Sequence, residues 1–350
     1  MVKQQTILSN AGGNLPYNTR MISTFPESSR RFPLSAVRAV LVIHGGAGTI
    51  LRENLTPRLE AEHLEALEAA LRIGYSALQS AGGSSLDGVA AAVQYLEDCP
   101  LFNAGRGSVF THDGSIEMDA AVMDGGTGKA GAVTGVRTVR NPVLLARKVL
   151  EQSPFAMLAG TGAEAFAASV GIPRTDPEYF RTEDRWQQLQ TQLRHETENA
   201  TATMSLSEDN KFGTVGAVAV DRGGNVAAAT STGGMTNKRY GRIGDSPVIG
   251  AGTWAENATC AVSATGHGEY FIRHAAAHDI AARMAYAGRS VSEAAYEVIH
   301  ERLMPVGGAG GVIAIDANGN ATLPFNTAGM YRGYITESGE TSIAIYSEDA

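Results

Sequence analysis

The sequence predicts a layered α+β protein in which two antiparallel sheets are stacked between helical layers. Strand-like segments occur as hairpins both before and after a polar segment in the middle of the chain. Helical segments are grouped on each side of these hairpins, whereas a parallel α/β protein would alternate single strands with helices. Both observations favour the α+β class.

Composition limits the classes of function. The chain has 350 residues, of which 43% are hydrophobic and 18% charged, the balance of a soluble globular protein with a sizeable core. Its apolar runs are shorter than the roughly 20 residues that cross a bilayer, so we expect no membrane span. A net charge of -8 provides no basic surface for phosphates, which argues against nucleic acid and favours a small-molecule partner. Cys99 and Cys260 make no disulfide framework, and we expect a cytoplasmic location.

Residues 1–38 are predicted to be a flexible N-terminal extension. They contain no apolar segment of signal-peptide length, and their hydrophobic periodicity is poor. The segment is basic and almost free of acidic residues, which leaves a weak organelle-targeting signal open as an alternative.

The ordered chain is expected to begin at Ala39 with the strand AVLVI, which leads into a glycine turn, HGGAG, at 44–48. Glycine-rich turns also form phosphate loops. However, the G-x-x-x-x-G-K-[ST] pattern is missing here and the next helix starts several residues later, so nucleotide binding is disfavoured.

Caps and prolines mark helix starts in the first half of the chain. Thr56 is expected to be an N-cap, followed by Pro57 at the first helical position, where its missing N–H costs nothing. Further helices are expected from Ser84 or Ser85 to the EDCP sequence at 97–100, from Asn141-Pro142 to about Gln152, and at 160–171. Between them, the alternating sequence around Asp113-Gly114 predicts a hairpin.

A polar linker is predicted at about 174–213, where charged and amide residues replace the aliphatic pattern. Such a segment can form an exposed helix but is not expected to build a core. A hairpin at 214–235 follows it, and then come a glycine-rich region to 268, helices at about 269–287 and 291–303, and further strands.

Two hairpin sequences echo each other. GAVAVDRGGNVAAATSTGGM at 216–235 and GVIAIDANGNATLPFNTAGM at 311–330 share Gly, Ala, Asp, Gly, Asn, Thr, Gly and Met at matching positions. Two residues before each copy, the first has Thr214 and the second has Ala309. Because the hairpin does not require this threonine, we expect Thr214 to serve chemistry.

Thr214 has the setting of a nucleophile that is released when the bond before it is cut. A threonine hydroxyl needs a base, and a free backbone amine, with a pKa of about 7.7 to 8.0, can supply it. Gly213 leaves its carbonyl unobstructed and tolerates a strained backbone. The ordinary alternative is that Thr214 is simply a β-branched strand residue.

Eight short blocks occur in a fixed order along the chain. They are HGGAG, CPLFNAGRG, EMDAAVMDG, GTVGAVAVD, ATSTGGM, GRIGDSP, SATGHGE and PFNTAGMY. In this order the chain resembles, over residues 39–347, the plant-type L-asparaginase and isoaspartyl peptidase family of N-terminal nucleophile hydrolases. The resemblance implies a four-layer αββα sandwich. It also implies an α subunit (39–213) and a β subunit (214–350) that form one structural domain after cleavage between Gly213 and Thr214.

The resemblance also implies the catalytic residues. Thr214 would be the nucleophile and its new amine the base, and Thr232 would support it through a hydroxyl hydrogen bond. The Thr265 hydroxyl and the Gly266 N–H would form the oxyanion hole, whose donors are each worth about 3 to 4 kcal/mol.

Substrate groups are assigned in the same way. Arg242 would hold the α-carboxylate of the substrate and Asp245 its α-ammonium group, with Gly268 lining the amine pocket and Asn103 near the nucleophile. Without the resemblance, Arg242 and Asp245 would pass for a surface ion pair.

No cofactor is implied for the chemistry, but a structural alkali cation, sodium, is. It would be bound by the backbone carbonyls of Leu96, Glu97, Cys99, Phe102, Ala104 and Arg106. Arg106 is unusual at a position where a small or aliphatic residue is expected.

The implied reaction is hydrolysis of L-asparagine to L-aspartate and ammonia, and of β-aspartyl dipeptides, through an acyl-enzyme on Thr214. The implied assembly is a dimer of cleaved heterodimers. Two alternatives remain: a glycosylasparaginase-like amidohydrolase, and an uncleaved, non-catalytic binding protein on the same scaffold.

Overall fold

The computed structural model describes residues 37–38, 40–198 and 213–347. Most of the predicted extension and the last part of the predicted linker lie outside the described residues. Within the described residues, no helix is both long enough and apolar enough to span a membrane.

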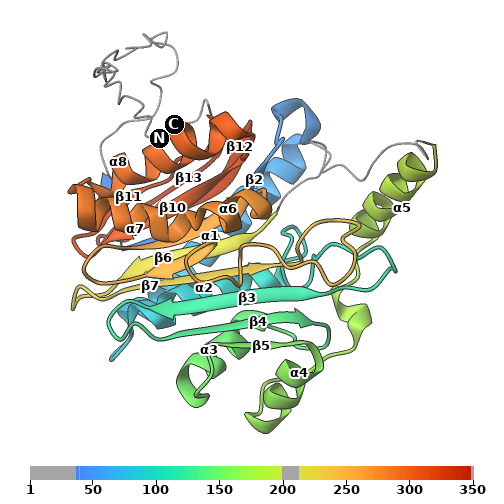
Figure 1. Ribbon diagram of the computed structural model, residues 1–350, viewed down its shortest axis with the longest axis horizontal. Helices are drawn as coiled ribbons and strands as arrows, with labels where there is room; N and C mark the ends of the chain where they lie inside the picture. The colour runs from blue at the N-terminus through green and yellow to red at the C-terminus, as the bar shows by residue number, and fades with distance from the viewer. Residues whose placement is uncertain (1–36, 39, 199–212, 348–350) are drawn as a thin grey trace, which may run out of the picture. The chain divides into compact units, whose positions relative to one another are not determined.

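The strands of the described residues form two sheets, one of eight strands and one of five (Figure 1). The larger has the order β13-β12-β2-β6-β7-β3-β4-β5, with only the β4–β5 pair parallel, and the smaller has the order β1-β11-β10-β9-β8. The larger sheet contains β2 (Leu41–Gly48), β3 (Met118–Asp124), β4 (Ala130–Val136), β5 (Met157–Ala159), β6 (Val215–Val220), β7 (Val226–Thr232), β12 (Gly329–Ile335) and β13 (Thr341–Tyr346). The smaller contains β1 (Val37–Arg38), β8 (Thr253–Ala255), β9 (Cys260–Gly266), β10 (Gly310–Asp316) and β11 (Asn320–Thr322).

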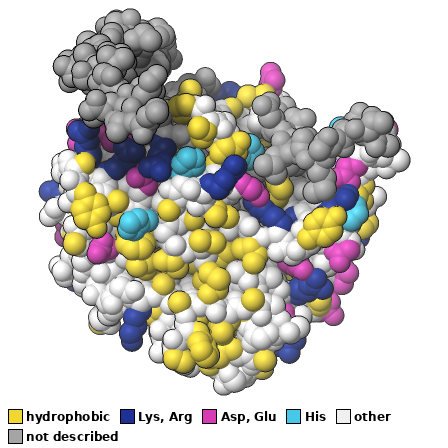
Figure 2. All heavy atoms as spheres, viewed as in Figure 1, with side chains coloured by type: hydrophobic (Ala, Val, Ile, Leu, Met, Phe, Trp, Pro, Cys, Tyr) yellow, Lys and Arg dark blue, Asp and Glu magenta, His cyan; other side chains and the backbone are white. Residues whose placement is uncertain are grey.

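Helices lie on the outer face of each sheet, which confirms the predicted αββα sandwich (Figure 1). The α-helices are α1 (Pro57–Gln79), α2 (Ser85–Asp98), α3 (Pro142–Gln152), α4 (Gly160–Ser169), α5 (Glu183–Glu198), α6 (Gly268–His274), α7 (Ala276–Ala287) and α8 (Val291–Tyr296). One hydrophobic core lies between α1–α3 and the larger sheet, a second between the two sheets, and a third between the smaller sheet and α7–α8. On the face shown in Figure 2, acidic and basic side chains are interspersed.

The local signals for helix starts are confirmed. The Thr56 hydroxyl accepts a hydrogen bond from the Leu59 N–H, and Pro57 is the first residue of α1. Ser84 caps α2 in a reciprocal capping box with Asp87. These contacts span only a few residues, which is why the sequence alone predicts them.

The two echoed hairpins have the same turn chemistry. The Oδ1 atoms of Asp221 and Asp316 each accept hydrogen bonds from the backbone N–H groups two and four residues later. The first hairpin joins β6 to β7 in the larger sheet, and the second joins β10 to β11 in the smaller one. The shared sequence therefore specifies the turn, and only the first copy is preceded by a threonine, Thr214, where the second has Ala309.

The HGGAG sequence is not a turn. It continues β2, whose eight residues are all buried and pair with β12 on one side and β6 on the other. A Cβ atom at Gly45 would lie 2.5 Å from the Phe102 ring, so the glycine is required by close packing against that ring.

Three other boundaries differ from the sequence prediction. The smaller sheet includes Val37 and Arg38, the last two residues of the predicted extension. The helix expected at 269–287 is broken at Ala275, which adopts a left-handed conformation with a φ of 47°. The helix expected at 291–303 changes to π-helical hydrogen bonding at Glu297.

The prediction that the 174–213 segment contributes nothing to the core is wrong for its described part. Phe180 and Leu189 are completely buried, and Trp186 packs against the same core. Trp186, Leu189 and Leu193 follow the i, i+3, i+7 spacing of one helix face. That stripe anchors α5, although the rest of the helix is polar.

Candidate active site

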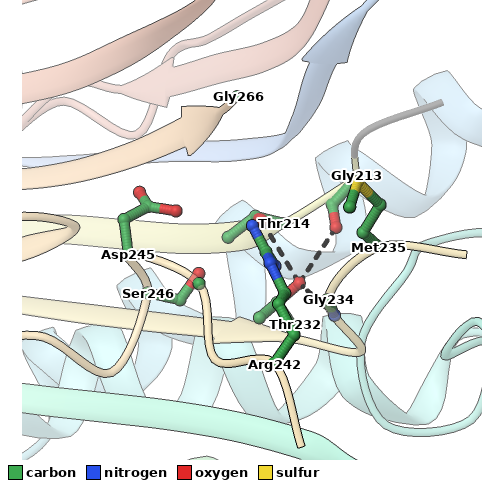
Figure 3. Close-up of a pocket in the computed structure, with 10 residues that line it drawn as sticks. Gly213, Thr214, Thr232, Gly234, Met235, Arg242, Asp245, Ser246 and Gly266 are labelled. Atoms are coloured by element: carbon green, nitrogen blue, oxygen red, sulfur yellow. Dashed lines mark hydrogen bonds between the residues drawn. The ribbon is translucent and has the colours of Figure 1, made fainter. Parts of the chain in front are cut away.

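Thr214 and Thr232 lie side by side at the ends of two paired strands. Thr214 immediately precedes β6, Thr232 ends β7, and the register pairs Val215 with Ser231. Both threonines are buried, and their Oγ1 atoms are 3.3 Å apart (Figure 3). The hairpin therefore positions the two hydroxyl groups.

The hydroxyl groups form a directed chain of hydrogen bonds to the Gly213 carbonyl. Thr214 Oγ1 donates to Thr232 Oγ1, which donates in turn to the Gly213 oxygen at 3.2 Å. The Gly234 N–H also donates to Thr232 Oγ1, at 2.9 Å. In the uncleaved chain this arrangement polarises both the Thr214 hydroxyl and the carbonyl before it.

Asn103 holds this arrangement in place through both ends of its amide. Its Nδ2 donates to the Gly234 carbonyl at 2.7 Å, and its Oδ1 accepts from the Val109 N–H at 2.9 Å. A Cβ atom at Gly213 would come within 2.8 Å of the Asn103 Cβ. A glycine is therefore needed before Thr214 for steric reasons as well as chemical ones.

His44 fixes the carbonyl on the other side of Thr214, a role that the sequence analysis missed. Its Nδ1 lies 2.9 Å from the Thr214 oxygen, so Nδ1 carries the proton, and Nε2 must then accept from Ser263 Oγ, also at 2.9 Å. Burial lowers the pKa of His44 to about 3, which keeps the ring neutral. The imidazole is thus a neutral, positioning group.

Arg242 and Asp245 lie in the same pocket, with Gly268 between them. A Cβ atom at Gly268 would lie 2.9 Å from both Arg242 Nη2 and Asp245 Oδ1. Among the described residues, Asp245 Oδ2 is buried and has no hydrogen-bond partner. Burial raises the pKa of Asp245 to about 7, and the Arg242 charge opposes that rise. A buried carboxyl with an unused oxygen suits a cationic ligand.

Glu269 is a second residue that the sequence analysis missed. Its carboxylate binds the Arg242 guanidinium with two hydrogen bonds, Nε to Oε1 at 2.9 Å and Nη2 to Oε2 at 3.0 Å. This pairing leaves Nη1 as the edge of the guanidinium not used by Glu269. The acid at the end of the SATGHGE block was the available signal.

A narrow pocket of about 10 Å³ unites most of the predicted residues. Its lining includes Gly213, Thr214, Thr232, Arg242, Asp245 and Gly266, with Met235, Gly234, Gly244 and Ser246 completing it. Thr265 does not line the pocket. Its hydroxyl oxygen accepts a hydrogen bond from the Ala47 N–H at 3.2 Å, and the oxyanion role of Thr265 and Gly266 stays a prediction.

The comparison with protein families agrees with this geometry. A family model described as Asparaginase matches residues 37–345. The chain belongs to the asparaginase family. It is 54% identical to an isoaspartyl peptidase of Escherichia coli (strain K12), over 89% of this chain and 97% of that protein. It is 43% identical to an isoaspartyl peptidase/L-asparaginase of Rattus norvegicus, over 84% of this chain and 85% of that protein.

The predicted cation loop of this asparaginase-family chain follows the end of α2. Leu96 and Glu97 are in the last turn, and Cys99 is the C-cap. The Leu96 carbonyl has Pro100, which lacks an N–H, at the position where its helical donor would be. The Glu97 carbonyl instead accepts from the Arg106 N–H at 2.7 Å, and the Arg106 side chain is exposed. Backbone carbonyls at a helix C-terminus suit a cation, so the residues at the end of α2 fit the predicted sodium ion.

We predict that product binding by this asparaginase-family site depends on the ionisation of Asp245. A protonated carboxyl cannot pair with an ammonium group, and the raised pKa keeps Asp245 protonated below about pH 7. The Kd of the cleaved protein for L-aspartate should therefore rise by about tenfold per pH unit as the pH falls below 7. Calorimetry in buffers of different ionisation enthalpy should show proton release approaching one near pH 6. A constant Kd between pH 5.5 and 8 would contradict the assignment.

Proposed function

We propose that the chain is an autoproteolytically activated hydrolase that converts L-asparagine to L-aspartate and ammonia and hydrolyses β-aspartyl dipeptides. The observation that carries this proposal is the directed hydrogen-bond chain from the Thr214 hydroxyl through Thr232 to the Gly213 carbonyl. The names of its relatives support the two substrate classes.

Activation starts in the uncleaved chain. As Thr214 Oγ1 bonds to the Gly213 carbonyl carbon, its proton passes to Thr232, and the Thr232 proton moves to the developing oxygen anion. The C–N bond then breaks as the proton on that oxygen passes to the Thr214 nitrogen, which frees the threonine amine and leaves Gly213 as an ester on the threonine oxygen. Water hydrolyses that ester to release the Gly213 carboxylate and to restore the Thr214 hydroxyl.

Turnover uses the new amine as the base. Arg242 and Asp245 hold the α-carboxylate and α-ammonium groups of the substrate, and Thr214 attacks its β-carbonyl. Thr265 and Gly266 receive the oxygen anion in this proposal. Ammonia or an amino acid takes a proton and leaves, and water then releases L-aspartate from the ester.

The test combines chain mass with activity. We expect purified protein to separate under denaturing conditions into chains of 213 and 137 residues, the latter beginning at Thr214, and to release aspartate from both substrate classes. Release of aspartate from N-acetylglucosaminyl-asparagine alone would favour the glycosylasparaginase alternative. A stable single chain without activity would favour the binding-protein alternative.

We propose that sodium binds the loop after α2 through the carbonyls of Leu96, Glu97, Cys99, Phe102, Ala104 and Arg106. Two observations support this proposal. The carbonyls at the end of α2 suit a cation, and the Arg106 side chain is exposed, so it does not fill the loop. Replacing sodium by tetramethylammonium at constant ionic strength should lower the Tm, and adding sodium back should restore it, because the ion binds only the folded state. Equal Tm values in the two buffers would contradict the site.

We also propose a dimer of cleaved heterodimers and a cytoplasmic location. The family resemblance supports the dimer, and the two unpaired cysteines, Cys99 and Cys260, suit a reducing compartment. Light scattering tests the assembly, with an expected mass of twice 36.6 kDa, and imaging of the tagged chain tests the location.

A further inference from the structure

A second, larger cavity lies next to the nucleophile pocket. Its volume is about 240 Å³, and Gly213 lines both spaces. Asn103, which holds the loop beside Thr232, also lines the larger cavity. The two spaces therefore meet at the bond that cleavage would break. Once Gly213 is a free chain end, it no longer has to separate them.

A substrate held at Arg242 and Asp245 would point its leaving group toward the larger cavity. Arg242 and Asp245 line the first pocket and not the second, whereas Gly213 lines both. Figure 3 shows Asp245 and Gly213 on opposite sides of Thr214. A substrate whose α-groups are held at Arg242 and Asp245, and whose β-carbonyl is at Thr214, projects its leaving group past Thr214. In a β-aspartyl dipeptide that group is a complete amino acid with its own carboxylate.

The walls of the larger cavity suit an amino acid side chain. Leucine, isoleucine and proline side chains form much of its lining. His63 stacks on Tyr331 with ring centroids 4.6 Å apart, and the edge of Phe102 meets both rings. Such apolar and aromatic walls with few charges are typical of small-molecule sites.

Arg185 provides a cation at the cavity wall with unused hydrogen-bond donors. Its Nε donates to the Gly107 carbonyl at 2.8 Å, and its Nη1 donates to Gln188 Oε1 at 3.2 Å. A guanidinium group has five N–H donors, and within the described part of the chain Nη2 and one N–H of Nη1 have no acceptor. Among the described residues, no carboxylate lies within ion-pair distance of Arg185. The exposed carboxylate of Asp184 also lines the cavity and interacts with the Arg185 charge, but it forms no salt bridge with it, which leaves the partly buried guanidinium group suited to an anionic ligand.

We infer that this cavity binds the departing amino acid of β-aspartyl dipeptides, and that Arg185 binds its α-carboxylate. The inference rests on the proposed function and assigns a substrate-recognition role to α5, on the cleaved α subunit. L-Asparagine has no such group, since its leaving group is ammonia. Arg185 therefore separates the two substrate classes.

The direct test uses the unmodified protein and two matched substrates. β-Aspartyl-leucine carries the carboxylate that Arg185 would bind, and β-aspartyl-leucinamide does not. We expect KM to be about 10- to 100-fold lower for the free acid, the range of one charge-assisted interaction. Equal KM values would overturn the inference while leaving the proposed function intact. A protein that cleaves neither peptide and leaves asparagine unchanged would contradict the proposed function itself.

The Arg185→Gln variant tests whether the KM difference between the free acid and the amide comes from the Arg185 side chain. Its KM for β-aspartyl-leucine should rise by about 10- to 100-fold, whereas KM for the amide and for L-asparagine should change by less than about threefold. Arg181→Gln is the matched control, because Arg181 is exposed, lies four residues before Arg185 and outside α5, and stacks on Trp186. Its kinetics should match wild type. Equal losses for all three substrates in the Arg185 variant would show a structural role and overturn the inference.

Discussion

The Thr214→Ala variant is expected to remain a single chain of 350 residues and to lose asparaginase activity by about 10⁴-fold or more. Alanine removes the hydroxyl that attacks Gly213, so the later base, the amine of residue 214, is never released. Both the nucleophile and the base are lost in one substitution. Intact-mass measurement and ammonia release check the two effects separately.

Thr214→Ser is the matched control for this prediction. Serine keeps a hydroxyl at hydrogen-bond distance from Thr232 and should still be cut, with a lower rate because it lacks the methyl group that restricts the side-chain rotamer. If the alanine variant instead yielded chains of 213 and 137 residues, the cleavage site or the nucleophile would be wrongly assigned.

Cleavage does more than create a nucleophile. In the uncleaved chain Gly213 lines the active-site pocket, whose volume of about 10 Å³ is too small for asparagine. The Gly213 carbonyl also accepts the hydrogen bond that the Thr232 hydroxyl donates. In the proposed function, removal of this chain end would free both the space and the hydrogen bond. We therefore expect the precursor to be inactive for a steric reason as well as a chemical one.

The sequence predicted those features that depend on a few neighbouring residues. The caps at Thr56 and Ser84 and the turn at Asp221 are fixed by contacts within four residues, and all are present. The order of the motif blocks also predicted Thr214 and Arg242 as site residues, and both line the same pocket.

The sequence did not predict contacts between distant segments. His44 meets Ser263 across 219 positions, and Glu269 meets Arg242 across 27. No local pattern encodes such pairings, because they depend on the stacking of two sheets and the path of a loop. The helix α5 is a different case. Its apolar stripe was present in the sequence, but the surrounding amide and charged residues concealed it.

Arg242→Lys is expected to lower kcat/KM for L-asparagine by about 10²- to 10³-fold and to leave autocleavage unchanged. Lysine keeps the charge, but it cannot bind Glu269 through two parallel hydrogen bonds and still present a further N–H to the substrate carboxylate. Cleavage should proceed because the hydrogen-bond chain from Thr214 to Gly213 does not include Arg242. Steady-state kinetics and intact-mass measurement check both parts.

Arg239→Lys is the matched control, since Arg239 is three residues away and pairs with Glu196 at 2.6 Å outside the pocket. Its kinetics should stay within about threefold of wild type. If kcat/KM of Arg242→Lys for L-asparagine also stayed within about threefold of wild type, the assignment of the substrate α-carboxylate to Arg242 would be contradicted. An uncut Arg242→Lys chain would instead show that the substrate-binding loop is needed for activation. The two variants at 214 and 242 therefore separate making the nucleophile, which needs Thr214 and Thr232, from using it, which also needs the cation that holds the substrate.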